Sequence, residues 1–561
     1  MANDRSTATG SAPSMENQAK GGGDLASGSR CSVVTWTDAG LAVTIAIWKT
    51  VPELGAPFSG DWNDIPSLDE LVLGWQAALA SVFGLFAGIN LSFAMAHVFA
   101  AVAMYFSARL SGGDRMWSWI AALAFGASPF IFAQSPHHMQ VAYVWPVAFF
   151  PLVWRWTASP AFVWDRSHRI WAILIAAMTG LHFVYYTNIF CQLTVLGACV
   201  SYVRNRDAKS LRMSMSLVVI AIACTAAMNI DSWTYQWVHG RAGQGIIREY
   251  KWLEIYGLKL VDLTIPPLTH RSDLFASFAL RHRQAAPLLD EGASYLGIVG
   301  LLSLGGLCVM TARALLAQRL DRVPLEAWQV MWIIIVFTTG GLNAIGGAYG
   351  FTLFRAACRY SVVLLAIVLV YAARELSAAS QRLGQRIGAE GRVILGGTIL
   401  AGVTALLFWD QVPRPPDSQT TALIAKQVQS DRDFVARMEN ALPPGAMVFQ
   451  LPIMEFPEAP HPGVSAYDHF RPYLHSHGLK YSYGASRGRE SSAWLQSISQ
   501  KQLKDAVAEI SKRGFAAIYI NRNGFPDRAK GIEDALLEMG YDRPVIRSAS
   551  GDLACIILSP K

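Results

Sequence analysis

Residues 352–371 read TLFRAACRYSVVLLAIVLVY, an apolar run that has two arginines near its start. A helix needs about 20 such residues to cross the ~30 Å hydrocarbon core of a bilayer. Further apolar runs of roughly 15–20 residues lie on both sides of it, at 91–107, 117–133, 141–156, 170–184, 189–203, 216–230, 294–311, 328–342 and 393–409. The sequence therefore predicts a polytopic α-helical membrane domain of about ten spans, in which the shorter helices tilt or locally thin the bilayer.

The basic residues between these runs predict the orientation. Alternate connections are rich in Lys and Arg, whereas 134–140, 185–188 and 346–351 contain neither. The basic set is Arg109, Arg115, Arg155, Arg166, Arg169, Arg204, Arg206, Lys209, Arg212, Arg313, Arg319, Arg322, Arg374, Arg382, Arg386 and Arg392. Because cytoplasmic loops carry the excess of positive charge, we expect the segment before residue 91, the loop 231–293 and the tail after residue 410 to lie outside.

The composition excludes several classes of protein. The chain has 561 residues, of which 52% are hydrophobic and 16% charged, which is too apolar for an ordinary soluble protein and too long for one domain. The basic loops account for much of the net charge of +7, so we expect no nucleic-acid partner. The seven cysteines have no paired spacing and predict neither a zinc site nor a disulfide framework.

The chain divides into four predicted parts. Residues 1–34 form a Gly- and Ser-rich leader that we expect to be disordered. A membrane domain follows at 35–410 with outer loops at 35–90 and 231–293, then a stiff linker at 411–428 and a small soluble α/β domain at 429–561.

The first outer loop, 35–90, raises a question of topology. It predicts two interfacial helices, 38–51 and 67–86, joined by a Gly/Pro loop that carries Asp61 and Asp64, which ordinary turn chemistry also explains. An outer start for residue 91 requires a crossing upstream of it. We expect that an upstream signal or first helix has been lost through a misassigned start or truncation; the alternative is that 71–86 crosses.

Polar side chains gather at the predicted outer edge of the membrane. His137 and His138 occupy the first connection that lacks basic residues, where finishing a helix at the interface is the simpler explanation. Tyr185 and Tyr186 follow in the next connection, beside His182, and are also typical of an aromatic belt.

The loop 231–293 contains EIYGLKLVDLTIPPLTHR, in which Glu254 and the pair His270 and Arg271 flank an apolar stretch. A loop of this length in a membrane protein is usually functional or structured, and this one is predicted to frame a lipid-facing cavity. Arg355 and Arg359 lie four residues apart on one face of the predicted span 352–371. Guanidinium groups at that depth indicate function unless they reach lipid headgroups.

The tail predicts helices at 431–441, 501–513 and 528–539 and strands at 447–451, 516–520, 545–548 and 553–558. Its densest polar segment combines aromatic residues with Glu455, Glu458, Asp468, Arg471, His475, His477, Tyr483, Arg487 and Arg489. Such a segment suits either a sugar-binding surface for an acceptor or a loop that docks the tail on the membrane domain, and both interpretations stay open.

These residues resemble a family. The segments GAPFSGDWNDIP, SYLGIVG, FRAACRYSVV, QLPIMEFPE and YDHFRPYLHSHGLKYSYGASRGR resemble, in the same order, large bacterial membrane proteins that carry labels such as phosphoglycerol transferase-like or sugar translocase, with a C-terminal domain of unknown function. The resemblance runs from about residue 35 to the end. The broader architecture resembles the GT-C membrane glycosyltransferases.

This resemblance implies roles for named residues. An acid early in the first outer loop, here Asp38, would act as the catalytic base, with Asp61 and Asp64 in reserve. Arg355, Arg359, His270 and Arg271 would bind the donor phosphate. The polar cluster of His137, His138, Tyr185, Tyr186 and Glu254 would line the outer edge, and the tail would hold the acceptor. A divalent metal is the one cofactor that the resemblance leaves open.

The resemblance implies a multi-pass protein of the bacterial inner membrane whose tail is extracytoplasmic. Its expected partners are membrane lipids, a polyprenyl-phosphate sugar donor and envelope-glycan assembly proteins. The predicted function is transfer of a sugar from that donor to an envelope glycan or lipid acceptor on the outer face. The alternative is a non-catalytic translocase of lipid or polysaccharide, or an assembly scaffold for envelope glycans.

Overall fold

The computed structural model of the chain describes residues 70–134, 139–158, 165–206, 208–240, 248–385, 388–456, 461–485, 487–542 and 544–558. The predicted leader 1–34 and the predicted helix 38–51 lie outside these residues, as do Asp38, Asp61, Asp64, His137, His138 and Glu458.

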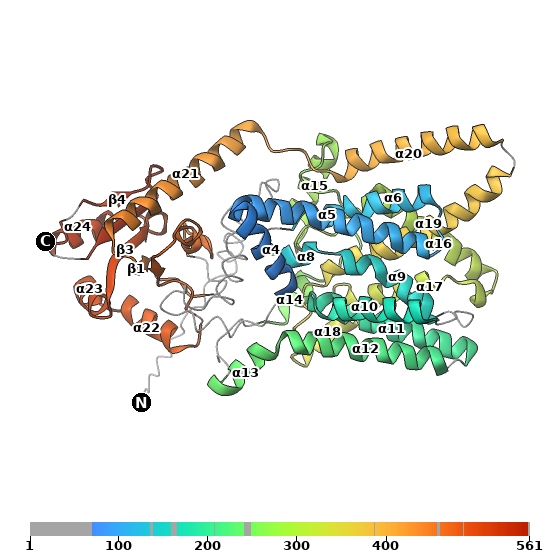
Figure 1. Cartoon of the computed structure of the whole chain (residues 1–561), viewed down its shortest axis with the longest axis horizontal. Helices are drawn as coiled ribbons and strands as arrows, with labels where there is room; N and C mark the ends of the chain where they lie inside the picture. Colours follow the sequence, from blue (N-terminus) through green and yellow to red (C-terminus); the bar gives the residue numbers. More distant parts are fainter. Residues whose placement is uncertain are drawn as a thin grey trace, which may run out of the picture.

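A bundle of helices is followed by an α/β tail, and the tail lies at one end of the bundle (Figure 1). The bundle contains α4 (Glu70–Phe83), α5 (Leu85–Leu110), α6 (Arg115–Gly126), α7 (Pro129–Phe132), α8 (Met139–Ala142), α9 (Trp145–Ala158), α10 (Arg166–Gly180), α11 (Val184–Asn205), α12 (Ala208–Met228), α13 (Ile230–His239), α14 (Lys251–Ile255), α15 (Asp273–Ala285), α16 (Gly297–Leu316), η4 (Leu320–Arg322), α17 (Leu325–Phe337), α18 (Leu342–Ala348), η5 (Ala357–Tyr360), α19 (Ser361–Gly384) and α20 (Ala389–Gln411).

Six of the described helices are long and apolar enough to cross a membrane, namely Leu85–Leu110, Val184–Val203, Ala208–Met228, Gly297–Leu316, Ala357–Leu383 and Glu390–Gln411. Four of the predicted runs overlap helices that are shorter than this. These helices are α6, α9, α10 and α17, which have 12, 14, 15 and 13 residues. At 1.5 Å per residue they are about 18–23 Å long, less than the ~30 Å core. The chain is therefore a multi-pass helical membrane protein, and ten complete crossings stay a prediction.

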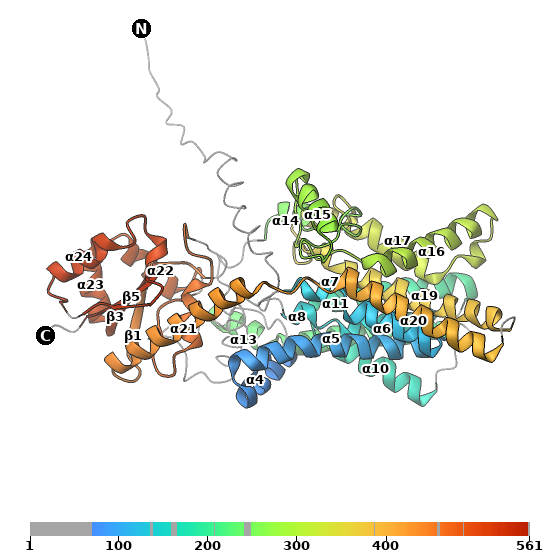
Figure 2. The same cartoon turned by 90° about the horizontal axis from the view of Figure 1, so that it is seen from above.

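The helices differ in how much of their surface they bury. In α19 67% of the apolar window is buried inside the molecule, whereas in α20 the share is 11%. Figures 1 and 2 agree with this difference, since α19 lies among the other helices and α20 lies along the edge of the bundle. A helix that is apolar all round and scarcely buried by protein faces lipid.

The start of the bundle differs from the prediction of separate helices at 67–86 and 91–107. α4 and α5 are joined by the single residue Gly84, whose φ of +80° suits glycine because a Cβ is disfavoured there. At Gly88 an added Cβ would lie 2.6 Å from the backbone nitrogen of Ala80, so α5 approaches α4 closely. α4 has 14 residues, about 21 Å, which is shorter than a crossing.

The predicted helix 352–371 begins late. Residues 351–356 are not helical, and the helix starts with the 3₁₀ turn at Ala357. Backbone groups of this segment bond elsewhere, since the amide of Ala356 donates to the Tyr185 hydroxyl (3.2 Å) and the Phe354 carbonyl accepts from Asn343 (3.2 Å). Arg355 and Arg359 therefore do not share one helical face, and this prediction was wrong.

The end of the bundle away from the tail carries the basic connections. Figure 1 places there the C-terminal end of α5, the connection between α16 and α17, and the adjacent ends of α19 and α20. At this end the buried Glu326 carboxylate of α17 accepts from Arg155 of α9 (3.2 Å) and Arg374 of α19 (2.8 Å). One carboxylate thus ties three helices together.

The tail is built on a five-stranded sheet of order β2-β1-β3-β5-β4. Its strands are β1 (Met447–Leu451), β2 (Lys480–Tyr481), β3 (Phe515–Asn521), β4 (Ile546–Arg547) and β5 (Leu553–Ile557). β1 is parallel to β2 and β3, while β5 is antiparallel to β3 and β4. Its helices are α21 (Ser418–Ala441), α22 (Glu490–Ser499), α23 (Leu503–Lys512) and α24 (Lys530–Glu538), with short 3₁₀ turns η6 (Asp468–Phe470), η7 (Pro472–Leu474) and η8 (Arg522–Gly524).

Alternating side chains of the strands build two cores. Ala517 and Tyr519 of β3 pack with Phe434 of α21 on one face. Ile518 and Ile520 pack on the other face, against α22, α23 and α24. This alternation has the period of two that a sheet covered on both sides requires. α21 occupies the second half of the predicted linker because Asp417 caps it by accepting from the Thr420 amide (2.7 Å).

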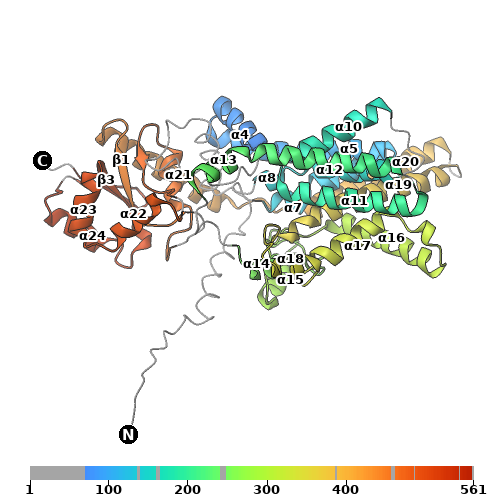
Figure 3. The ribbon, with the colours of Figure 1, turned by 90° about the horizontal axis from the view of Figure 1, so that it is seen from below.

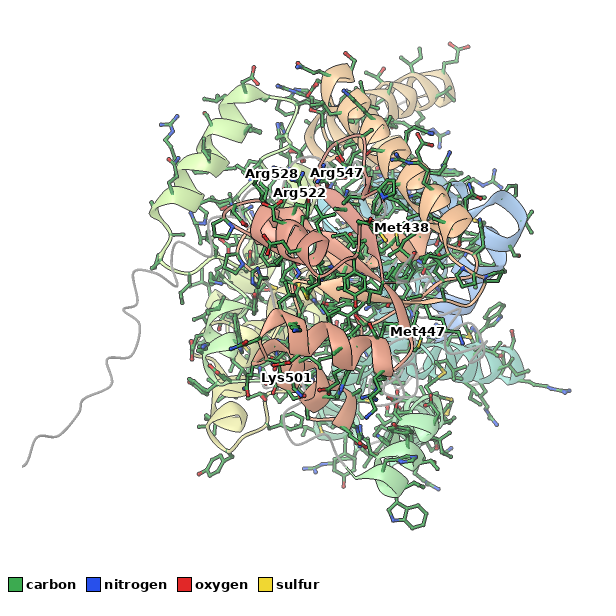
Figure 4. The ribbon with its side chains drawn as sticks, turned by 90° about the vertical axis from the view of Figure 1, so that its left-hand side faces the viewer. Met438, Met447, Lys501, Arg522, Arg528 and Arg547 are labelled. Carbon is green, nitrogen blue, oxygen red and sulfur yellow. The ribbon has the colours of Figure 1, made fainter. Side chains whose placement is uncertain are left out.

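Charged networks complete the tail. The buried Arg471 binds Asp431 through two hydrogen bonds, Nε to Oδ2 (2.9 Å) and Nη2 to Oδ1 (2.6 Å), and its Nη2 lies 2.9 Å from Asp552 Oδ2. Figure 4 shows a second cluster, in which Arg522, Arg528 and Arg547 lie side by side. Arg522 and Arg547 in that cluster pair with Glu533.

His469 makes the stability of the tail depend on pH. Burial lowers the pKa of this side chain to about 4 from its usual 6.5, although Nε2 donates to the Pro452 carbonyl (2.7 Å). Within the described part of the chain, Nδ1 has no hydrogen-bond partner. Because the unfolded chain takes up the proton first, we expect the free energy of unfolding of the tail to fall by about 3 kcal/mol as pH falls from about 6.5 to about 4.

Urea-dependent proteolysis of the tail in the full chain, repeated from pH 7 to pH 4, measures this effect. His469→Gln keeps an Nε2 donor and cannot titrate. It should therefore remove this part of the dependence of the unfolding free energy on pH. An unchanged slope in the variant would show that other groups are responsible.

Candidate functional site

The turn that begins α11 holds together the segments at the tail-side end of the bundle. The buried Tyr185 hydroxyl donates to the Leu353 carbonyl (3.0 Å) and accepts from the Ala356 amide (3.2 Å). The Tyr186 hydroxyl donates to the Val141 carbonyl (2.5 Å), and His182 Nε2 lies 2.6 Å from the Tyr143 carbonyl. The tyrosine pair predicted at this edge thus fixes the position of both neighbouring segments.

Arg359 is buried here in a strong ion pair. Its Nη2 donates to Glu291 Oε1 (2.6 Å) and its Nε to Oε2 (2.9 Å), and its guanidinium lies over the rings of Phe183 (5.5 Å) and Tyr185 (5.3 Å). A bidentate pair of this kind satisfies the charge of the arginine inside the protein. Arg359 is therefore occupied by Glu291 in this arrangement.

Arg355 differs from its neighbour. Its side chain is half-buried, and among the described residues it has neither a carboxylate nor any other hydrogen-bonding partner. Arg248, Arg355 and Arg359 all lie close enough to the Tyr185 hydroxyl to act on it electrostatically. Arg248, Arg355 and Arg359 thus gather positive charge around Tyr185, where Glu291 pairs with Arg359. Positive charge of this kind attracts anions.

The bundle also holds an apolar groove of about 430 Å³. Its walls come from α4, α5 and α9 and from Tyr143, and the lining residues are Val72, Trp75, Phe99, Val102, Ala103, Phe106, Tyr143, Trp145 and Phe149. Phe99, Val102 and Phe106 are exposed, so the groove opens at the outside of the bundle. We call Arg248, Arg355 and Arg359 the arginine cluster. The turn 182–186 connects the groove to this cluster, because His182 contacts the carbonyl of Tyr143 and Tyr185 donates to the carbonyl of Leu353, two residues before Arg355.

The loop motif 254–271 lies apart from this groove. The cavity that it frames has about 40 Å³ and walls of mixed character, in which Asp262, His282 and Asp290 are polar members. Asp262 Oδ1 lies 2.9 Å from His282 Nε2, and burial together with the Asp262 charge raises the pKa of Asp290. No described residue of this loop lines the apolar groove, so the lipid-facing cavity predicted for the loop stays a prediction. Glu254 accepts from the Tyr250 hydroxyl (2.8 Å).

His270 belongs to a separate buried cluster. Its Nδ1 accepts from the Ser272 amide (2.9 Å), so in the neutral ring Nε2 carries the proton, and that atom lies 3.6 Å from Asp410 Oδ1. Burial lowers the pKa of His270, and Asp410 opposes this shift. Asp410 also accepts from the Tyr295 hydroxyl (2.7 Å) and the Ile298 amide (2.7 Å).

Arg271 lies beside that cluster, at the exit of the chain from α20. Its Nε donates to the Val412 carbonyl (3.0 Å), and Arg414 donates to the Arg271 carbonyl (2.9 Å) and to Asp273 (2.5 Å). The structure therefore places His270 and Arg271 at the anchor of the tail's linker, and brings only Arg355 and Arg359 of the four predicted phosphate-binding residues to the tyrosine turn.

The predicted residues of the tail's polar segment fall into two groups, those that bind inside the tail and those that contact the bundle. Several of its predicted residues bind inside the tail: Glu455 pairs with Arg487 (2.8 Å), Asp468 accepts from the amide and hydroxyl of Ser465, and Arg471 pairs with Asp431. Two others reach the bundle, since the rings of His475 and Phe86 are 5.7 Å apart and Arg489 donates to the carbonyls of His239 and Gly240.

The partners Glu291, Asp410 and Tyr295 were missed from the sequence. Glu291 stands just before the apolar run 294–311, Tyr295 lies at the start of that run, and Asp410 follows the run 393–409, which was the available signal. Within the described ranges, no three Cys, His, Asp or Glu side chains lie close enough together to hold a metal ion.

Comparisons with known proteins give one kind of match. No protein-family model matches the chain, and no curated protein matches it. The chain is similar to two crystal structures of ArnT from Cupriavidus metallidurans. The apo structure is 12% identical, with a TM-score of 0.45, and the match covers 94% of each chain. The structure bound to undecaprenyl phosphate is 11% identical, with a TM-score of 0.44 and coverage of 97% of this chain and 99% of that chain.

This likeness concerns the overall architecture alone.

Proposed function

We propose that this chain is a membrane glycosyltransferase that takes a sugar from a polyprenyl-phosphate donor at the tail-side end of its bundle. The observation that carries the proposal is Arg355, a half-buried cation with no acidic partner among the described residues. A guanidinium is costly at the edge of a membrane unless an anion or water meets it. A lipid phosphate supplies that anion.

The apolar groove supports a lipid rather than a free phosphate as the donor. Its aromatic and aliphatic walls open outside the bundle, where acyl or polyprenyl chains lie. The turn 182–186 contacts both the groove, through Tyr143, and the segment that carries Arg355, through Tyr185. A donor can thus place its chain in the groove and its phosphate beside the arginine.

The distribution of charge supports an outer location for this site. The basic connections belong to the opposite end of the bundle, and positive connections are cytoplasmic. The tail and the arginine cluster then face the periplasmic side of a bacterial inner membrane. An acceptor would reach the site from that side, next to the tail.

The reaction that follows is a displacement at the sugar carbon. The acceptor oxygen forms a bond to that carbon as the bond to the phosphate oxygen breaks, and the polyprenyl phosphate leaves with the electron pair. Arg355 stabilises the charge that develops on the leaving phosphate. Asp38, which lies outside the described residues, accepts the proton of the acceptor hydroxyl.

A transfer assay tests this function. Membranes that contain the full chain are incubated with a radiolabelled polyprenyl-phosphate sugar, and label is followed into the envelope-glycan and lipid fractions. We expect label to move in a chain-dependent way and Asp38→Asn to stop the movement. Transfer that continues undiminished in Asp38→Asn removes Asp38 from the mechanism, and a complete absence of chain-dependent transfer favours a translocase or a scaffold.

A further inference from the structure

The short helix α13 has two faces of different character. Ile230, Trp233, Trp237 and Val238 form an apolar stripe, and each of these side chains is more than half exposed. The opposite face contains Ser232, which is buried, and Tyr235 and Gln236, which are half-buried. Trp237 has 88% of its surface exposed, which is far more than an indole ring in a protein core.

The position of α13 explains what covers the apolar stripe. α13 begins immediately after α12, with only Asn229 between the two helices (Figure 3). α12 is a candidate membrane span of which only 17% is buried by protein, so lipid surrounds most of it. The chain therefore leaves the hydrocarbon at the start of α13. Trp side chains are enriched at this depth, because the ring is apolar and its N–H reaches water.

The other face of α13 is held by the tail. Arg489 donates to the carbonyls of His239 and Gly240, both at 2.9 Å, and its guanidinium lies 5.3 Å from the centre of the Tyr235 ring. The Tyr235 ring is itself tilted against His239 at 4.4 Å. The last carbonyls of a helix lack partners within the helix, so a cation at this end satisfies them and also opposes the negative end of the helix dipole.

We propose that α13 lies in the outer interface of the bilayer, with its Ile230–Trp233–Trp237–Val238 stripe inserted among phospholipids and its opposite face gripped by Arg489 of the tail. The occupant of the stripe is lipid, because the stripe continues the lipid-covered surface of α12. The tail is thereby fixed at a defined height above the membrane, through a helix whose own height the bilayer sets.

Spin-label accessibility tests the proposal in the full chain, reconstituted in phosphatidylcholine nanodiscs. A label replaces Trp237 in one protein and Asp231 in another, in a background without the native cysteines. Asp231 is the matched control, because it is exposed on the same helix and lies about 120° around the helix axis from Trp237. Collisions with oxygen report lipid, and collisions with a soluble nickel chelate report water.

We expect oxygen to exceed the nickel chelate at position 237 and the reverse at position 231. Equal access of the nickel chelate at both positions would overturn the proposal. A label at 237 that neither reagent reaches would also overturn it, because a protein partner or a second copy of the chain would then cover the stripe.

A second measurement tests whether Arg489 holds the tail against α13. Arg489→Ala should broaden the distance distribution between labels on α13 and on α23, while oxygen access at position 237 stays unchanged. Arg487→Ala is the control, because this neighbour pairs with Glu455 inside the tail and should leave the distances narrow. An unchanged distribution in Arg489→Ala would show that other contacts hold the tail.

Discussion

Replacing Arg355 with alanine is expected to lower sugar transfer by about 10²–10³-fold while the protein stays folded. The size follows from removal of one group that stabilises a developing oxyanion at a sheltered site. The fold should survive because, among the described residues, no side chain depends on Arg355 for an ion pair. Transfer from the labelled donor, measured beside the melting temperature in detergent, separates the two effects.

Two other arginines serve as controls for that variant. Arg281→Ala removes an exposed cation of α15 and should leave transfer within about twofold of the wild type, since a solvated surface charge contributes little. Arg359→Ala leaves Glu291 without its partner and should instead lower the melting temperature. If Arg355→Ala transfers sugar at the wild-type rate, the guanidinium of Arg355 contacts lipid headgroups and has no role in transfer.

Replacing Arg471 with alanine is expected to destabilise the tail by about 3–5 kcal/mol. Asp431 and Asp552 both lie within 2.9 Å of this guanidinium, and all three side chains are buried or nearly so. Removal of the cation leaves two carboxylates close together in a site of low dielectric, and breaking a buried pair costs this much. Amide hydrogen exchange of β3 in the full chain reports the free energy of opening.

The exposed pair Lys501–Glu509 provides the comparison. Lys501→Ala should change the free energy of opening, measured by the same exchange, by less than about 1 kcal/mol, because surface ion pairs contribute little. A similar small change in Arg471→Ala would mean that water replaces the guanidinium and that the network is not a source of stability.

Local pattern was sufficient for much of the fold. Each of the ten apolar runs overlaps a helix. The strand predicted at 447–451 has the bounds of β1, because its residues are apolar except for Gln450, as burial on both faces of a sheet favours. β2 and α22 were missed in the polar segment of the tail, since Lys480 and Tyr481 form a strand only through their pairing with Met447 and Val448. The late start of the helix at Ala357 has a similar cause, because Tyr185 and Asn343 bind the backbone before it.

The site was less predictable than the fold. The sequence singled out Arg355 and Arg359 for their depth in an apolar run, but it predicted the same role for both, binding of the donor phosphate. Their difference depends on Glu291, which stands 68 residues before Arg359 in the chain and meets it only in the folded bundle. His270 likewise looked like a phosphate ligand beside Arg271, and its burial against Asp410 depends on the packing of α20.

The central claim is that a lipid phosphate binds at Arg355 with its chain in the apolar groove. The most direct test compares the binding of a polyprenyl phosphate and the matching polyprenol to the purified full chain. A charged hydrogen bond contributes about 1.5–3 kcal/mol, so we expect the phosphate to bind about 10- to 100-fold more tightly than the alcohol. Arg355→Ala should remove most of that preference. Equal affinity for the two lipids, or a preference that persists in Arg355→Ala, would contradict the account.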